Sequence, residues 1–319
     1  MNTYLKTRNL ALWFLFFIAI ILSLINGAVK IPLANLLLKD NLIIVNMRML
    51  RILTAILAGS GLAVSGIALQ AILRNPLAEP YLLGTSSGAG LAAVIAVIIG
   101  ISRMYVPLAA FLGAVISIIL VYNIAREGNR IPDKSLLLAG VIVSIALSAV
   151  IVFLVSIFGN KAMHEVMWWL WGSLEVYNWR ILFLACMPVI LGITIIYIFA
   201  QDLNAIIMGE EEALHLGIDT QVVKKILILI TALITASLIS ICGIIGFVGL
   251  IVPHIMRMVV GSNHRILIPY TCLAGSVFMV VCDVISRTLF APFEIPIGVI
   301  TAIIGTPVFI ILLKRKKRF

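Results

Sequence analysis

The sequence has 319 residues, of which 63% are hydrophobic and 11% are charged, and its formal net charge is +10. A soluble domain carries charge on roughly a quarter of its residues, so this composition excludes a soluble protein and indicates an integral membrane protein. We interpret the surplus of Lys and Arg as a signal of membrane topology and anchoring, so a lipid bilayer is the expected partner and no nucleic acid is expected.

Ten apolar runs follow one another along the chain. A helix that spans a bilayer needs about 20 apolar residues, and the runs cover residues 10–28, 49–69, 83–102, 106–125, 134–158, 180–200, 222–242, 246–260, 267–288 and 296–313. We therefore predict an all-α fold: a polytopic membrane protein with ten transmembrane helices, in a single domain over residues 1–319. No room remains for a soluble domain.

The first run follows Lys6 and Arg8, as the apolar part of a signal peptide would. No convincing small-residue cleavage site comes after this run. We therefore interpret it as a retained first helix.

The third run opens with a glycine-rich stretch, GTSSGAG at residues 84–90. A phosphate-binding loop of the Walker type would continue with GK[ST], which is absent here. We interpret these small residues as sites of close helix packing, which small residues commonly provide in membranes.

Residues that carry catalytic or metal chemistry are scattered. No HExxH or GxSxG pattern surrounds the four histidines, and the four cysteines form no CxxC pair. The histidines are His164, His215, His254 and His264, and the cysteines are Cys186, Cys242, Cys272 and Cys282. We predict no catalytic residue, no metal site and no cofactor bound by this chain, and we expect the cysteines to be small buried packing residues.

The orientation follows from the positive residues, which are retained on the cytoplasmic side of a membrane. With the N-terminus inside, the alternate loops and the C-terminal tail place 15 Lys and Arg on the inner side and 8 on the outer side. We therefore expect both termini in the cytoplasm. The longest inner loop, about residues 201–223, then contains the acidic segment MGEEEALHLGID (208–219).

Asp283 is the main acidic residue inside an apolar run, and Arg287 follows it by four residues. This spacing places both on one helix face, which indicates a structural ion pair. A proton relay is the alternative, because ionisable residues inside a membrane are often functional. An ion-coupled secondary transporter therefore remains an alternative function, whereas a membrane enzyme lacks a catalytic pair.

Four stretches resemble the membrane-spanning permease subunits of ABC importers for iron-siderophores, haem and vitamin B12, the FecCD-like type II family. They are RNPLAEPYLLGTSSGAG (74–90), MGEEEALHLGID (208–219), GIIGFVGLIVPHIMRMVVGSNHRILIP (243–269) and DVISRTLFAPFEIPIGVITAIIGTPVFIILL (283–313). With the ten-helix count, the resemblance covers nearly the whole chain.

The resemblance implies a multi-pass permease in the cell (inner) membrane. Its expected partners are a second copy of the chain, two cytoplasmic ABC ATPase subunits and an extracytoplasmic substrate-binding protein. ATP and Mg²⁺ would bind to the ATPase, which explains the missing phosphate loop. The expected cargo is an iron-siderophore, haem or cobalamin chelate, with an iron-siderophore as the first choice because that class is broad.

In this family the inner loop after the sixth helix carries a coupling helix that contacts the ATPase. The resemblance places this role on Gly209, Glu210, Glu211, Glu212, Ala213, Leu214, His215, Leu216 and Gly217. The three glutamates suit the first turn of a helix, where negative charge meets the positive end of the helix dipole. Gly217 suits a left-handed helix end.

The family docks its binding protein through arginines on the outer face, and the matching residues are Arg48, Arg51 and Arg287. These residues lie on the outer side of the membrane, where the topology rule does not account for positive charges. Anchoring at the lipid headgroups, with the Asp283 pair, is the other interpretation.

Two further regions match the family only in part. The MWWLWG piece of the loop between the fifth and sixth helices resembles a short re-entrant helix, and Trp168, Trp169 and Trp171 are possible cavity aromatics or an interfacial belt. The family's inner gate corresponds to the start of the fifth helix. Where relatives often have small hydroxyl residues, this chain has Asp133 and Lys134. The resemblance therefore assigns only the region, which is Asp133, Lys134 and Ser135.

Overall fold

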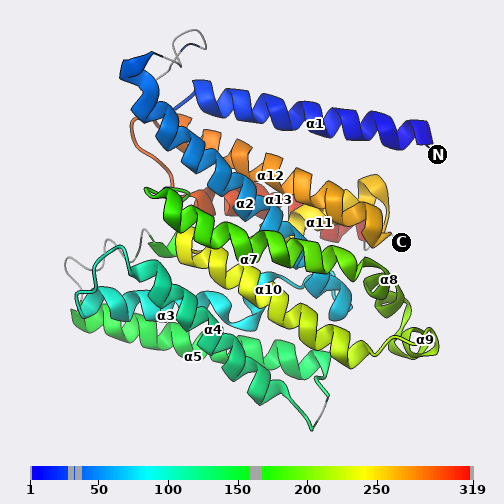
Figure 1. Ribbon diagram of the computed structural model, residues 1–319. Coiled ribbons are helices and arrows are strands. Elements are labelled where there is room, and N and C mark those ends of the chain that lie inside the picture. Colours follow the sequence, from blue (N-terminus) through cyan, green and yellow to red (C-terminus); the bar gives the residue numbers. More distant parts are fainter. Residues whose placement is uncertain are drawn as a thin grey trace.

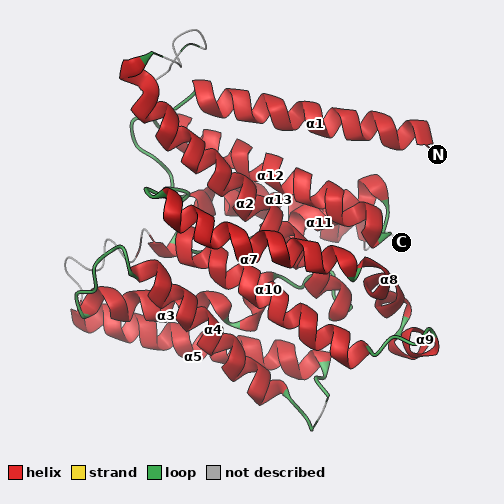
Figure 2. Ribbon diagram, viewed as in Figure 1, coloured by secondary structure: helices red, strands yellow, loops and turns green. Residues whose placement is uncertain are grey.

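The computed structural model describes residues 2–27, 32, 38–128, 130–158, 167 and 169–316. Within these residues the chain forms twelve α-helices and two short 3₁₀ helices (Figures 1 and 2). Ten of the α-helices each overlap one of the predicted apolar runs. They are α1 (Asn2–Ile25), α2 (Leu42–Ile72), α3 (Thr85–Ile98), α4 (Val106–Ala125), α5 (Asp133–Phe158), α7 (Trp179–Ile198), α10 (Thr220–Cys242), α11 (Val248–Val260), α12 (His264–Thr288) and α13 (Ile297–Lys316).

Six of these helices, α2, α4, α5, α7, α10 and α12, are long and apolar enough to cross a membrane. The other four, α1, α3, α11 and α13, contain shorter apolar stretches. The all-helical prediction is therefore confirmed for the described part of the chain, while the count of ten membrane crossings stays a prediction. The remaining helices are η2 (Lys39–Asn41), η3 (Pro80–Leu83), α8 (Ala200–Met208) and α9 (Glu210–His215).

Helix α2 lies at the centre of the bundle. Every residue from Leu57 to Ile72 is buried, and α12, α10, α11 and α7 all pack against it. The helices α3, α4 and α5 form a second group on the other side of α7 and α10 (Figure 1). A helix that is apolar all round is expected at such a central position.

Glycine allows α2 to approach its neighbours closely. A Cβ atom added to Gly59 would overlap the carbonyl group of Gly275 on α12, and one added to Gly66 would overlap the backbone of Gly249 on α11. Helices α3 and α4 also approach each other closely at a glycine. A Cβ on Gly88, in the GTSSGAG stretch, would collide with Ser117. These small residues serve close packing, as predicted, since bilayer helices gain contact area when their backbones approach.

Two of the quoted sequence stretches hold each other in place. Glu79 Oε1 accepts a hydrogen bond of 2.6 Å from the backbone N–H of Phe247, and Tyr81 Oη accepts one of 3.1 Å from the N–H of Ile245. Phe247 is the residue before α11 and has a positive φ of 70°. Glu79 and the 3₁₀ helix η3 that follows it thus supply the hydrogen-bond acceptors that the irregular start of α11 lacks.

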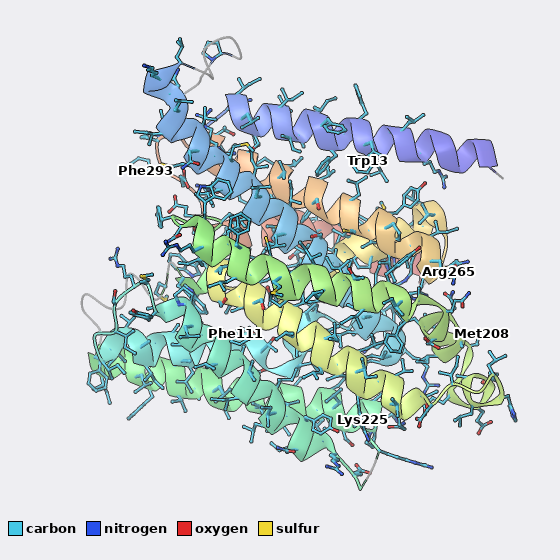
Figure 3. All side chains as sticks on the ribbon, in the orientation of Figure 1. Trp13, Phe111, Met208, Lys225, Arg265 and Phe293 are labelled. Carbon is cyan, nitrogen blue, oxygen red and sulfur yellow. The ribbon has the colours of Figure 1, made fainter. Side chains whose placement is uncertain are left out.

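The ends of the bundle differ in what they carry. Figure 1 places both chain ends beside α8 and α9, at what we name the α9 end. In Figure 3, Met208, Lys225 and Arg265 lie toward this end, whereas Phe293 lies at the opposite end, which we name the Phe293 end.

The sides of the bundle expose large apolar residues, including Phe153 on α5 and Leu184 on α7. This surface suits lipid or another membrane subunit.

The close approach at Gly59 gives a test of the packing. Ala normally stabilises a helix by up to about 1 kcal/mol relative to Gly, but Gly59→Ala should destabilise the protein by about 1–3 kcal/mol because α2 and α12 must separate. Thermal unfolding of the purified protein in detergent would measure the change. Met47→Ala, at an exposed position of the same helix, is the control, and an unchanged or raised midpoint for Gly59→Ala would contradict the packing.

Candidate functional site

The predicted coupling segment forms a short helix with a defined start. Glu210, Glu211 and Glu212 make up the first turn of α9, where negative charge interacts favourably with the helix dipole. Gly209 precedes them with φ 154° and ψ 153°. This positive φ lies in a region that residues with a Cβ rarely adopt, so the entry into the helix favours glycine.

The end of α9 is also specified by the sequence. Gly217 has a φ of 80°, its N–H donates to the carbonyl of Leu214 at 2.9 Å, and the N–H of Ile218 donates to the carbonyl of Ala213 at 3.0 Å. This pair of bonds is a Schellman motif, which satisfies the last carbonyls of a helix. The helix is therefore closed at both ends by glycine.

The side chains of the segment separate into an inner and an outer set. Ala213 is fully buried against the bundle. Leu214 and Leu216 are 58% and 67% exposed at the α9 end of the molecule. Exposed leucines beside exposed Glu211 and Glu212 give α9 a mixed apolar and acidic outer face.

A buried lysine connects α9 to two other helices. Lys224, the fifth residue of α10, is 2% exposed, and its Nζ lies 2.6 Å from Glu210 Oε1 and 2.6 Å from Asp133 Oδ1. Arg74 Nη2, just after α2, lies 3.4 Å from Glu210 Oε1 and 3.6 Å from Asp133 Oδ2. We name Arg74, Asp133, Glu210 and Lys224 the Lys224 cluster; it borders a polar cavity of about 670 Å³.

The predicted inner gate region lies in this same place. Asp133 begins α5 and belongs to the Lys224 cluster. Ser135 Oγ donates to Glu127 Oε1 at 2.9 Å, and Lys134 is exposed beside the cavity. The structure therefore brings the gate region and the coupling segment together through side-chain contacts.

A second charge cluster lies at the Phe293 end. Asp283 on α12 is fully buried, with Arg51 Nε 2.6 Å from its Oδ1 and Arg287 Nη2 2.7 Å from its Oδ2. Arg51 also lies 2.7 Å from Glu294 Oε2 and 3.3 Å from Glu175 Oε1. We name these five residues the Asp283 cluster. The pair of Asp283 with Arg287 has the i, i+4 geometry that the sequence indicated.

Of the three arginines predicted to dock a binding protein, Arg48 and Arg287 are buried and Arg51 is mostly covered, and their docking role stays a prediction. Arg48 points to the carbonyl of Ile25 at 3.2 Å, and Arg287 donates to Ser23 Oγ at 2.6 Å. The side chain of Arg51 is only 11% exposed, whereas that of Glu175 is 40% exposed. Acidic side chains of the same chain therefore cover Arg51, because a buried guanidinium needs an opposite charge.

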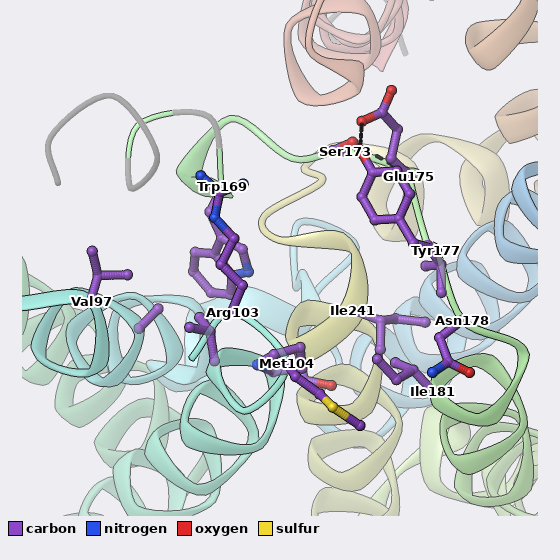
Figure 4. A pocket seen from close by; sticks show the side chains of 15 residues that line it. Val97, Arg103, Met104, Trp169, Ser173, Glu175, Tyr177, Asn178, Ile181 and Ile241 are labelled. Atoms are coloured by element: carbon purple, nitrogen blue, oxygen red, sulfur yellow. Dashed lines mark hydrogen bonds between the residues drawn. The ribbon is translucent and has the colours of Figure 1, made fainter. Parts of the chain in front are cut away.

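The candidate cavity aromatics lie in different surroundings. Trp169 lines a cavity of about 650 Å³ together with Arg103, Met104 and Tyr177 (Figure 4). Trp171 is partly exposed, and Trp168 lies outside the described residues. A hydrogen bond from Tyr177 Oη to Glu175 Oε2, at 2.6 Å, raises the pKa of Tyr177 to about 12.

The described end of the MWWLWG piece contacts the bundle through its backbone. The N–H of Gly298 donates to the carbonyl of Trp171 at 3.1 Å, and that of Ile297 donates to the carbonyl of Gly172 at 3.2 Å. Ser173 N–H donates to the carbonyl of Cys242 at 2.8 Å. This piece therefore joins the start of α13 to the end of α10.

Sequence reasoning missed four members of the two clusters. Lys224 and Arg74 were counted only as topology charges, and Glu175 and Glu294 were not considered as partners of Arg51. The sequence did hold one indication of these contacts. Only 13 residues of the chain are acidic, and a lysine near the start of an apolar helix needs one of them as a neighbour. Which acid supplies it depends on how distant helices pack.

Comparison with known proteins gives a match over nearly the whole chain. The profile described as the FecCD transport family matches residues 15–315. The chain is 39% identical over 276 residues to the cobalamin import system permease protein of Halobacterium salinarum, covering 86% of this chain and 74% of that one. It is 34% identical to the hemin transport system permease protein of Yersinia pestis, covering 85% and 83% of the two chains.

A solved structure shows a similar fold. It is described as an inward-facing conformation of a metal-chelate type ABC transporter, and it matches with a TM-score of 0.87 and 33% sequence identity. The match covers 98% of this chain and 99% of that one. The similarity therefore includes the arrangement of the helices as well as the sequence.

The Glu210 contact should make stability depend on pH. The hydrogen bond from Lys224 holds the pKa of Glu210 below its ordinary 4.5, so this contact stabilises fully above that value and is lost as pH falls through the lowered pKa. The native protein should therefore exceed Glu210→Gln in unfolding temperature at neutral pH, and the difference should vanish in acid. Glu211→Gln, at an exposed carboxylate, is the control. A difference that does not change with pH would contradict the assignment.

The Asp283 cluster predicts unequal effects for two of its acids. Asp283→Asn leaves two buried arginines short of a negative charge and should cost about 3–5 kcal/mol of unfolding free energy. Glu175→Gln, at a half-exposed position, should cost less than about 1 kcal/mol. Thermal unfolding in detergent would compare them, and equal losses would show that burial does not set the strength of these pairs.

Proposed function

This chain belongs to the FecCD transport family, and from that premise we propose that it imports a metal chelate across the inner membrane as the permease subunit of an ATP-driven transporter. Its homologues are permeases of ABC importers. The observation that carries the proposal is α9, a helix capped by glycine at both ends that presents an exposed apolar and acidic face at the end of the bundle holding both chain termini.

In the proposed assembly, two copies of this chain enclose the transport path and the α9 end faces the cytoplasm. Each copy would present α9 to one ATPase subunit, which binds ATP and Mg²⁺. The outer face of α9 supports this role. A partner that covers Leu214 and Leu216 would remove their apolar surface from water, which favours binding. Movement of the ATPases would then shift the permease between two states, one open to each side of the membrane.

At the Phe293 end we propose that a substrate-binding protein docks. The sequence assigned this role to Arg48, Arg51 and Arg287, and their burial restricts how they can act. An acidic residue of the binding protein would reach Arg51 by displacing Glu175 or Glu294, the exposed members of the Asp283 cluster. Such an exchange of ion pairs would affect orientation and association rate more than affinity.

The cargo proposed is a large metal chelate of the iron-siderophore, haem or cobalamin type. Relatives named for cobalamin and hemin support this class. Trp169, which lines the cavity in Figure 4, and the exposed Trp171 offer flat apolar surfaces against which a ring could stack. Asp283 gives no support to ion coupling, because two arginines hold its charge.

The test of the importer proposal uses the permease reconstituted into proteoliposomes with its ATPase and binding protein. Cyanocobalamin, haemin and a ferric siderophore would be supplied outside, and uptake of at least one should require ATP. Uptake driven by an ion gradient without the ATPase would overturn the proposal.

The coupling role of α9 has its own test. Glu211→Ala combined with Leu216→Ala should weaken assembly with the ATPase, or lower transport per ATP hydrolysed by roughly 5-fold or more, because the outer face of α9 is lost. Ser262→Ala with Arg265→Ala, an exposed pair near the start of α12 at the same end, is the control. Normal assembly and normal coupled uptake in the α9 variant would contradict the role.

A further inference from the structure

The start of α5 contains an unexplained departure from the family pattern. Asp133 replaces the small hydroxyl residue that the resemblance led us to expect, in the region of the inner gate. The described structure supplies its partner, because Asp133 Oδ1 lies 2.6 Å from the Nζ of the buried Lys224. The same ammonium lies 2.6 Å from Glu210 on α9. One side chain therefore contacts both the coupling segment and the gate region.

We propose that Lys224 is a positioning residue that links α9 to the first turn of α5, so that a displacement of α9 moves the gate region. The inference rests on the proposed coupling function of α9 and adds the route by which movement would leave that helix. Lys224 touches no ATPase residue and no cargo in this role. It acts by holding two carboxylates from different helices at a fixed separation.

The start of α10 is well placed to make this link. Gln221 Oε1 accepts a hydrogen bond of 3.2 Å from the backbone N–H of Ile131, two residues before α5. Thr220 and Lys224 are buried, and Asp219 caps the helix by accepting bonds from the N–H groups of Gln221 and Val222. Two contacts from one rigid turn of α10 thus hold the start of α5, and one of them is shared with α9.

Electrostatic attraction between Lys224 and the two acids holds α9 and the start of α5 together. Without the ammonium of Lys224, Asp133 and Glu210 would be two neighbouring carboxylates, and like charges at short range repel each other. Arg74 lies within 3.6 Å of both acids, but its side chain is 45% exposed, so solvent screens its attraction. Lys224 therefore supplies the buried part of the attraction between α9 and α5.

The experiment uses the complete permease–ATPase complex in lipid nanodiscs and measures hydrogen–deuterium exchange with and without ATP and vanadate. In the native complex, trapping should change exchange in both segments 209–217 and 131–138. In Lys224→Met, segment 209–217 should keep its response while the response of segment 131–138 falls by about 5-fold or more. Lys225→Met, the adjacent residue outside the Lys224 cluster, should behave as the native complex does.

A double-mutant cycle with Asp133→Ser tests whether the effect runs through this contact. If it does, Asp133→Ser with Lys224→Met should be no worse than Lys224→Met alone, because both changes remove one interaction. An undiminished response of segment 131–138 in Lys224→Met, or fully additive losses, would overturn the inference. No response of segment 209–217 in the native complex would instead overturn the coupling role of α9, and the inference with it.

Lys224→Met should still fold, because the two acids that it leaves keep access to water and to Arg74. Size-exclusion profiles and ATPase activity of the complex would check this. A variant that assembles and hydrolyses ATP, yet transports less chelate per ATP, separates a positioning role from a purely structural one. Unchanged transport per ATP in that variant would count against the proposal.

Discussion

Buried charge in an apolar bundle must be neutralised within the bundle, and this constraint organises both ends of the molecule. Asp283 at one end and Lys224 at the other are almost inaccessible to solvent. Each is held by opposite charges from other helices, because the energetic cost of an isolated buried ion is several kcal/mol. Arg51 of α2 and Arg287 of α12 hold Asp283, whereas Asp133 of α5 and Glu210 of α9 hold Lys224. Acids in the loops before α7 and α13 also pair with Arg51, so the two clusters tie together segments that are remote in the sequence.

Helix α2 connects the two clusters. Arg51 near its start belongs to the Asp283 cluster, and Arg74 just after its end belongs to the Lys224 cluster. At about 1.5 Å of rise per residue, its 31 residues reach across a bilayer. Glycines along it let α12 and α11 pack against its backbone. A long, closely packed helix resists bending, so α2 is suited to be the fixed frame for the proposed displacement of α9 and α5.

The ion pairs that the arginines form within the chain change how the proposed docking face would bind a partner. Arg51 and Arg287 are paired with acids of the same chain, Arg48 contacts a backbone carbonyl, and the more exposed members of the Asp283 cluster are the carboxylates Glu175 and Glu294. In the proposed docking, an acid of the binding protein would compete with Glu175 and Glu294 for the guanidinium of Arg51. A surface of this kind favours rapid exchange over tight attachment, since each ion pair gained is offset by one that is lost.

The sequence by itself determined the local features of this protein. Apolar runs predicted where the ten helices lie, because the length and composition of a membrane helix follow from the bilayer. Gly217 and the three glutamates predicted the end and the first turn of α9, because caps and dipoles act over a few residues. The i, i+4 relation of Asp283 and Arg287 was readable for the same reason.

Only the tertiary structure decided which charges meet across the bundle. Arg51 and Asp283 are 232 positions apart, and Lys224 and Asp133 are 91 apart. No local pattern pairs such residues, since their contact depends on the rotation and depth at which whole helices pack. Burial of the docking arginines, and the link between α9 and the start of α5, follow from that packing. The helices could be located from the sequence, but the partners of their few charged residues could not.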